Sequence, residues 1–199
     1  MSIIDYLEAH GFKMNELEGG CHQIPQQVQD LKDITNRSNL NVMEIGFNSG
    51  YSADTFLSNN DSLKLTSFDL GYHPYVKVAK EYIDHTYPNR HTLILGDSRD
   101  TVRNFIIKNK NTKFDIIFID GGHDYIISKL DLKNCFQLAH KDTTVIMDDT
   151  YFDMNGVFEW TYGPTRTWEE HLKAGKIVEI NRKHYSDGRG MAWGKYVFD

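Results

Sequence analysis

Short apolar, β-branched runs alternate with helical stretches along most of this chain, and each run ends in an acidic residue or leads into a glycine. The pattern predicts strands over residues 41–45, 65–69, 92–97, 114–120 and 144–149. It predicts helices over residues 51–59, 75–87, 99–108 and 125–140. Strands that alternate with helices pair in parallel through right-handed crossovers, which place helices on both faces of the sheet. The chain is therefore expected to fold as a doubly wound α/β domain.

The last part of the chain departs from this alternation. A loop around Gly163 and Pro164 leads into a helix expected over residues 162–173. Two strands are expected over 177–185 and 191–198, joined by a segment whose Asp-Gly pair is a strong hairpin signal. Five strand-and-helix units followed by an antiparallel hairpin is the predicted order of elements.

The first 38 residues have a helical pattern with breaks at Gly19-Gly20 and at Pro25. They are expected to form a helical N-terminal appendage to a catalytic α/β core over residues 39–199. A chain of 199 residues has the length of one ordinary domain, so 1–199 is interpreted as a single domain.

Composition narrows the class of protein and its partners. The net charge of −6 argues against binding to a phosphate backbone, which needs clustered Lys and Arg. The N-terminus lacks the pattern of a signal peptide, and no apolar run has the roughly 20 residues that span a bilayer. Cys21 and Cys135 are far apart, so neither a disulfide framework nor a zinc site is expected. We expect a cytoplasmic protein that acts on a small molecule without nucleic acid or membrane; homo-oligomer formation stays open.

The first predicted strand leads into Gly46-Phe47-Asn48-Ser49-Gly50. Glycines at such a strand-to-helix turn let a ligand approach the backbone closely. The spacing is neither G-x-G-x-x-G nor that of a phosphate-binding loop. An ordinary tight turn would account for two glycines equally well, so further residues have to decide.

Those residues lie at the ends of the next two strands. Asp69 could accept hydrogen bonds from both ribose hydroxyls of a nucleoside, and Asp97 could bond an adenine amino group with Ser98 as a further donor. Each aspartate alone could equally be a helix N-cap. Together, at the carboxyl ends of an open sheet, they favour a nucleoside-binding crevice.

Several segments resemble class I S-adenosylmethionine-dependent methyltransferases. They are Glu44-Ile45-Gly46-x-x-x-Gly50, Gly96-Asp97-Ser98 and the run from Phe114 to Tyr125 that contains Ile119-Asp120-Gly121-Gly122-His123-Asp124-Tyr125. With the later Asp148-Asp149, they most resemble the branch that includes sugar and macrolide O-methyltransferases. The resemblance covers roughly residues 40–150. It implies S-adenosylmethionine as cofactor and a mostly parallel, seven-stranded sheet whose last strand is antiparallel. The cofactor contacts it suggests are Glu44, Gly46, Asn48, Gly50, Asp69, Asp97, Ser98 and Asp120.

Asp120, Asp148 and Asp149 end two strands that should be neighbours in the sheet. Carboxylates that converge there repel each other unless they are protonated or neutralised by a cation, and oxygen ligands suit Mg²⁺. A bound Mg²⁺ could lower the pKa of a substrate hydroxyl. The alternative is that the three aspartates are caps and solvated turn residues.

His123 follows Asp120 by three residues, and its ordinary pKa suits a general base near neutral pH. The resemblance supports this role, with Asp120 beside it as a catalytic residue. The alternative is a turn histidine bonded to the nearby backbone. Methyl transfer also needs water to be excluded, and the candidate lids are residues 19–25 and the aromatic-rich segment 151–168.

The favoured function is Mg²⁺-assisted O-methylation of a small hydroxylated substrate, with sugars as one candidate class. A metal-independent methyltransferase is the second interpretation, and a catalytically inactive module that binds S-adenosyl compounds is the third. A nicotinamide-dependent oxidoreductase is disfavoured, because the glycine spacing is wrong and Asp97 would have no role in it.

Overall fold

A single seven-stranded sheet, in the order β3-β2-β1-β4-β5-β7-β6, forms the middle of the molecule. The computed structural model describes residues 1–18, 24–151 and 158–198. The strands are β1 (Asn41–Ile45), β2 (Lys64–Asp69), β3 (His91–Leu95), β4 (Phe114–Ile119), β5 (Ala139–Asp148), β6 (Ile177–His184) and β7 (Gly190–Tyr196). Strands β1 to β5 pair in parallel, and β7 is antiparallel to both β5 and β6. The predicted doubly wound, mostly parallel sheet is confirmed.

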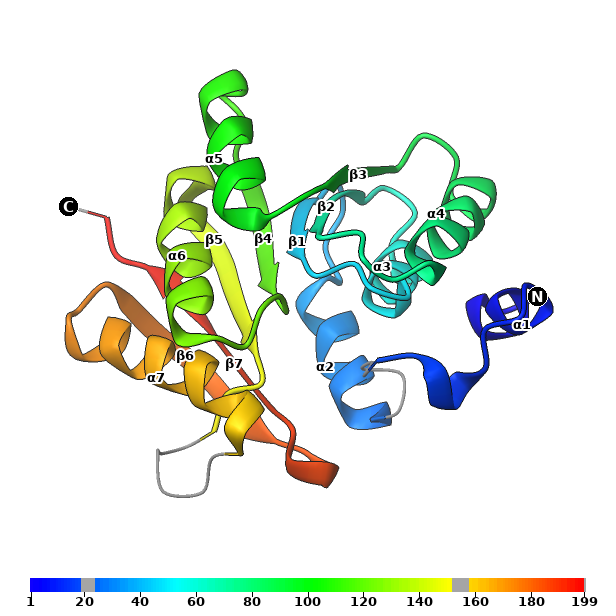
Figure 1. Ribbon diagram of the computed structural model, residues 1–199. Helices are drawn as coiled ribbons and strands as arrows, with labels where there is room; N and C mark the ends of the chain where they lie inside the picture. The colour runs from blue at the N-terminus through cyan, green and yellow to red at the C-terminus, as the bar shows by residue number, and fades with distance from the viewer. Residues whose placement is uncertain (19–23, 152–157, 199) are drawn as a thin grey trace.

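Helices cover both faces of the sheet (Figure 1). They are α1 (Ile3–Ala9), α2 (Pro25–Ile34), α3 (Tyr51–Asn59), α4 (Tyr75–Thr86), α5 (Ser98–Lys108), α6 (Tyr125–Cys135) and α7 (Glu159–Lys173). Helices α1 to α4 share one hydrophobic cluster with the sheet, and α5 to α7 share the other. Neighbouring strand residues enter opposite clusters, as Val42 and Met43 do, because side chains alternate along a strand. This double burial explains why the strands are apolar throughout.

Two predicted boundaries in the second half of the chain are wrong. The helix predicted over 125–140 ends at Cys135, and a short 3₁₀ turn leads into β5, which already begins at Ala139. Ala139 pairs with Phe114 of β4, and Thr143 donates to the Phe114 carbonyl at 2.6 Å. These long-range contacts override the local helical spacing of Ala139.

Gly163 and Pro164 lie inside α7, not in the loop that the sequence indicated. A Cβ on Gly163 would lie 2.1 Å from the carbonyl oxygen of His123. The glycine is therefore a packing residue that lets α7 approach the backbone after β4. Trp168 anchors the same helix, because its indole donates to Glu179 of β6 at 2.6 Å.

The N-terminal helices pack onto the same core as the sheet. Leu7 of α1 and Leu31 of α2 are fully buried, and α1 contacts α4 while α2 contacts α3. Pro25 is the first residue of α2, a favoured position for proline, so it starts a helix instead of breaking one. The break expected at Gly19-Gly20 lies outside the described residues. Within the described ranges, no helix has both the length and the apolar character needed to cross a bilayer.

Candidate active site

A cavity of about 300 Å³ lies at the carboxyl ends of the parallel strands. It is close to β1 and β4, the neighbouring strands from which the strand order runs in opposite directions. Open α/β sheets bind ligands at this topological switch point. Six of the predicted cofactor residues line the cavity: Gly46, Asn48, Asp69, Asp97, Ser98 and Asp120. Glu44 and Gly50 are not among the lining residues.

The loop after β1 is shaped by close contact with the end of β4. Gly46 has φ +95°, and a Cβ there would lie 1.8 Å from the carbonyl oxygen of Asp120. Only glycine permits this approach, which brings Asp120 beside the loop. Asn48 follows with φ 48°, and within the described residues its buried side-chain oxygen has no hydrogen-bond partner. Asn48 thus presents an unsatisfied acceptor where a ligand N–H or O–H could bind.

Asp69 orders this loop while lining the cavity. One of its carboxylate oxygens accepts from the backbone amides of Phe47 at 3.0 Å and Asn48 at 2.8 Å. The other accepts from the amide of Gly71 at 2.7 Å. A carboxylate has about four acceptor sites, so capacity remains for the predicted bond to a ribose hydroxyl.

Asp97 serves as the N-cap of α5, which was the alternative to a nucleoside contact for this residue. Its side chain accepts from the Arg99 amide at 2.9 Å and from the Arg99 guanidinium at 2.9 Å and 3.0 Å. The Arg99 guanidinium holds the pKa of Asp97 below its usual value. Asp97 and Ser98 still border the cavity, so the predicted adenine contact remains a prediction.

Glu44 and Gly50 support the cavity from behind. The fully buried Glu44 carboxylate accepts from the hydroxyls of Ser52 on α3 and Ser67 on β2. Burial raises the pKa of Glu44 to about 7. Gly50 is the left-handed N-cap of α3 and packs against Ile3. The structure does not bring either residue to the cavity as a direct contact.

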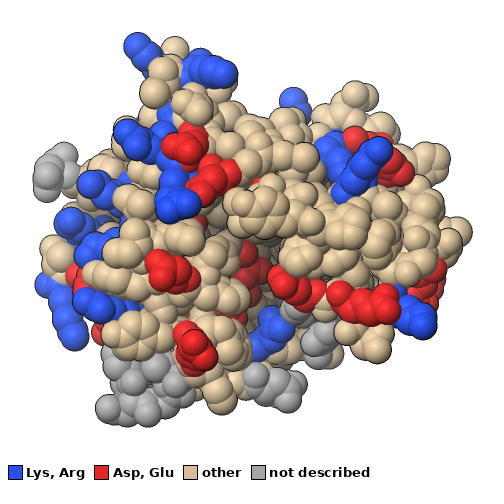
Figure 2. All heavy atoms as spheres, viewed as in Figure 1, with Lys and Arg blue, Asp and Glu red and all other residues tan. Residues whose placement is uncertain are grey.

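A second cavity of about 410 Å³ adjoins the first. Both are lined by the loop after β1 and by Asp120 and His123, while Tyr51, Trp160 and Arg189 line only the second. Acidic side chains lie in the recessed middle of the face shown in Figure 2, whereas Lys and Arg gather over α5 to α7. The two cavities are separate spaces that meet at Asp120 and His123.

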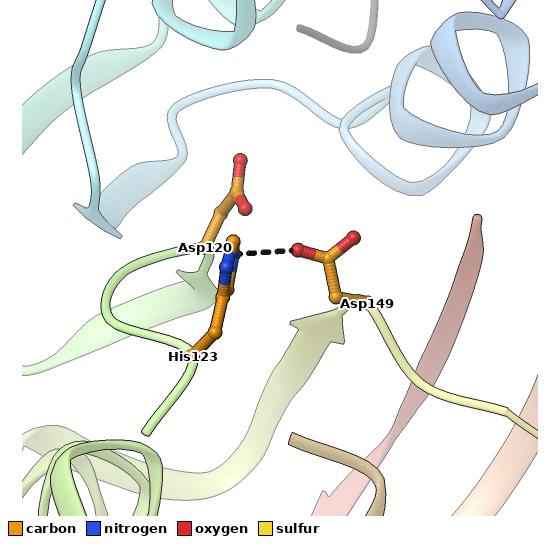
Figure 3. A group of neighbouring side chains, drawn as sticks. All are labelled: Asp120, His123 and Asp149. Atoms are coloured by element: carbon orange, nitrogen blue, oxygen red, sulfur yellow. Dashed lines mark ion pairs between the residues drawn. The ribbon is translucent and has the colours of Figure 1, made fainter. Parts of the chain in front are cut away.

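Asp120, His123 and Asp149 form a cluster at this junction (Figure 3). Each offers a donor atom, and these atoms all lie within 4.8 Å of one another. His123 Nε2 is 2.8 Å from one carboxylate oxygen of Asp149, whose other oxygen is buried without a partner among the described residues. Asp149 has φ 57°, a left-handed conformation that aspartate tolerates better than most residues. The turn aims its side chain into the cluster.

Asp148 is not part of this cluster, although it was predicted as a metal ligand with Asp120 and Asp149. Its two carboxylate oxygens accept from the Gln27 amide of α2 at 2.7 Å and 2.8 Å. Asp148 is the last residue of β5, and neighbouring side chains leave a strand end on opposite faces. The structure therefore brings together two of the three predicted ligands and adds His123.

The cluster attracts protons or a cation. Burial and the neighbouring carboxylates raise the pKa of Asp120, and burial followed by Asp149 raises the pKa of Asp148 to about 8. The hydrogen bond to Asp149 raises the pKa of His123. The carboxylates of Asp120 and Asp149, the latter with a buried oxygen that has no partner among the described residues, suit a hard cation such as Mg²⁺, whereas the imidazole is an atypical Mg²⁺ ligand.

The predicted lids are described only in part, since residues 19–23 and 152–157 lie outside the described ranges. Within the second segment Trp160 lines the second cavity, while Trp168 is buried in the core. Sequence reasoning did not single out Trp160, Arg189 or Gln27. Trp160 is one of several aromatic residues in the segment 151–168, and Arg189 lies between the last two predicted strands, where no motif marks it.

Comparison with known proteins agrees with this geometry. Residues 43–150, more than half of the chain, match the family model described as a methyltransferase domain. No curated protein sequence matches the chain.

Among the solved structures that share the fold are three that align with 98%, 98% and 97% of this chain, in the order given below. An O-methyltransferase from Bacillus cereus in complex with SAH is 18% identical, with 89% of its chain covered and a TM-score of 0.72. The O-methyltransferase TomG from Streptomyces achromogenes, in complex with SAM, is 14% identical, with 88% covered and a TM-score of 0.73. A TDP-rhamnose 3'-O-methyltransferase of calicheamicin biosynthesis is 20% identical, with 90% covered and a TM-score of 0.65. This chain belongs to the methyltransferase-domain family and has the class I S-adenosylmethionine-dependent methyltransferase fold.

Proposed function

We propose that this protein transfers a methyl group from S-adenosylmethionine to a hydroxyl oxygen of a small molecule. The observation that carries the proposal is the meeting of two cavities at Asp120 and His123. The first would hold the methyl donor and the second the acceptor. Two O-methyltransferases of the same fold were solved with SAH or SAM, which supports S-adenosylmethionine as the methyl donor.

The residues around the first cavity fit the donor. Asp69 and Asp97 offer carboxylates toward it, and Asn48 offers a buried acceptor without a protein partner among the described residues. When bound, S-adenosylmethionine supplies an electrophilic methyl group on a sulfonium. The protein therefore has to align the reactants and exclude water, with no need for a covalent enzyme intermediate.

His123 is the proposed base that takes the proton of the acceptor hydroxyl. It borders both cavities, and its Nε2 bonds to Asp149. A carboxylate in this position orients the imidazole and stabilises its protonated form. The ring nitrogen that does not bond to Asp149 then remains to accept the proton.

Asp120 and Asp149 are the residues that would hold Mg²⁺. When bound, the cation supplies a Lewis acid that lowers the pKa of a coordinated hydroxyl. A metal-independent reaction is the second candidate, favoured by the short contact of 2.8 Å that already joins His123 to Asp149. In that mechanism Asp149 acts only through the imidazole.

A labelled-methyl assay tests the proposal. The protein is incubated with methyl-labelled S-adenosylmethionine and a panel of hydroxylated sugars and catechols, with Mg²⁺ or with EDTA. Sugars belong in the panel because one structural neighbour is a TDP-rhamnose 3'-O-methyltransferase. The proposal predicts label in a methyl ether, and its loss in EDTA would favour the metal-assisted reaction. Amines and thiols are assayed in parallel, and label on nitrogen or sulfur but on no oxygen would contradict the proposal.

A further inference from the structure

Arg189 is the only lysine or arginine among the described residues that line the second cavity. Neither binding of the cofactor in the first cavity nor proton removal by His123 uses this side chain. Its surroundings in the cavity are otherwise acidic, with Glu18, Asp120 and Asp149 on the walls. A single cation placed in an acidic pocket calls for a specific explanation.

The backbone around Arg189 is held at several points. The amide of Arg189 donates to Ser186 at 3.2 Å, and its carbonyl accepts from Tyr185 at 2.8 Å. The carbonyl of the next residue, Gly190, accepts from the Thr150 amide at 3.0 Å, and a Cβ on this glycine would lie 2.0 Å from the Thr150 carbonyl oxygen. This contact places Arg189 beside the chain that carries Asp149.

The hairpin that carries Arg189 is also fixed to the rest of the fold. A Cβ on Gly188 would lie 2.3 Å from the ring of Phe158, so the turn packs closely at the start of α7. On the other side, Tyr185 and Lys183 bond to the buried Asp30 of α2 at 2.8 Å and 2.6 Å. The backbone that carries Arg189 is therefore ordered before a ligand arrives, and only the side chain has to be fixed on binding.

The guanidinium of Arg189 has no hydrogen bond or ion pair with any residue in the described ranges, although its charge reaches Asp120 and Asp148 and partly offsets the rise in their pKa values. Two of the neighbouring acids bond to other residues: Asp148 accepts from Gln27, and one oxygen of Asp149 bonds to His123. By contrast, Arg166 is paired with Glu170. The donors of Arg189 are therefore available to a ligand in the second cavity.

We infer that Arg189 is the anion-binding group of the acceptor site, and that the acceptor carries a carboxylate or phosphate on the molecule whose hydroxyl is methylated. The inference rests on the proposed function. A guanidinium presents a planar fork of N–H donors that matches either anion with two parallel hydrogen bonds. It would also offset the repulsion between an anionic acceptor and the acidic walls. Trp160 provides a flat apolar wall in the same cavity for the body of the acceptor.

Calorimetric titration with two matched pairs of probes tests this inference. Protein saturated with S-adenosylhomocysteine, without added metal, is titrated with 3,4-dihydroxybenzoate against 3,4-dihydroxybenzyl alcohol. Glucose 6-phosphate against glucose forms the second pair. At least one anionic probe should bind about 10- to 100-fold more tightly than its neutral partner, as expected for hydrogen bonds to a charged group. The pair that responds distinguishes a carboxylate from a phosphate.

Variants assign the preference to Arg189. Arg189→Gln should abolish the difference within the responding pair and leave the affinity for S-adenosylhomocysteine unchanged. Arg189→Lys should retain part of the difference in affinity, because lysine keeps the positive charge but lacks the planar set of guanidinium N–H donors. Arg103→Gln, at an exposed position on α5, makes the same change in net charge and should keep the full preference. Thermal unfolding of each variant checks that the fold is intact.

Three results would overturn the inference: no preference for either anion in the native protein, a preference that survives in Arg189→Gln, or an equal loss in Arg103→Gln. Failure of S-adenosylhomocysteine to bind would contradict the proposed function instead. The probe pairs are then titrated against the protein alone, where the same comparison decides the role of Arg189.

Discussion

Replacing Gly46 with alanine should destabilise the protein more than the same replacement at a left-handed glycine that has free space around it. It should also disturb the cofactor cavity. Gly46 has φ +95°, and its new Cβ would lie 1.8 Å from the carbonyl oxygen of Asp120. Gly175 has φ +66°, yet nothing lies within 4 Å of a Cβ placed there. The pair separates the cost of the backbone conformation from the cost of the clash.

The left-handed conformation alone costs an L-residue about 1–2 kcal/mol, which is the loss expected for Gly175→Ala. Overpacking against backbone adds about 1–3 kcal/mol, so Gly46→Ala should lose about 2–5 kcal/mol in free energy of unfolding. Relief of the clash requires β1 and β4 to separate at the loop that carries Asn48. The affinity for S-adenosylhomocysteine should therefore fall at least about tenfold in Gly46→Ala and stay near the native value in Gly175→Ala.

Urea unfolding and calorimetric titration of the two variants measure these quantities. Equal losses of stability in both, together with unchanged affinity for S-adenosylhomocysteine, would show that the loop after β1 does not depend on close contact with Asp120. The explanation given above for the shape of the cavity would then be refuted.

Three further predictions concern single side chains. Asp69→Ala should weaken binding of S-adenosylhomocysteine by about 1–3 kcal/mol in calorimetry, because three backbone amides of the cavity wall lose their acceptor; unchanged affinity would reject this role. His123→Ala should lower turnover about 10²- to 10⁴-fold in the labelled-methyl assay with little change in cofactor affinity, and near-native turnover would remove His123 as the base. Glu44, with its pKa raised from 4.5 to about 7, binds a proton more tightly in the folded than in the unfolded state, so its contribution to stability falls as pH rises between these values. Glu44→Gln should remove that part of the pH dependence, about 3 kcal/mol at most, and an unchanged slope in urea unfolding from pH 4 to 8 would contradict it.

Local patterns in the sequence were sufficient for most of the sheet. The bounds predicted for β1 and α3 coincide with those observed, because periodicity and the glycine turn between them are local signals. The junction of α6 and β5 was misplaced because Ala139 joins the sheet through Phe114, a partner 25 residues away in the chain. No window of neighbouring residues contains that information.

The candidate site was predicted as a set of strand ends, and its errors concern the direction of side chains. Asp148 and Asp149 are adjacent, and alternation along a strand already implies that they face opposite ways. This local signal alone predicts that only one of the two reaches the cluster. Arg189 and Trp160 reach the second cavity only through the register of the β6–β7 hairpin and the docking of α7, which are long-range features.

The central claim is that the cavity at the strand ends binds an S-adenosyl cofactor. Calorimetric titration of the purified protein with S-adenosylhomocysteine, with and without Mg²⁺, tests it most directly, with NADH as the competing ligand. We expect one saturable site for S-adenosylhomocysteine, weakened in Asp69→Ala, and no site for NADH. Binding of NADH without binding of S-adenosylhomocysteine would contradict it.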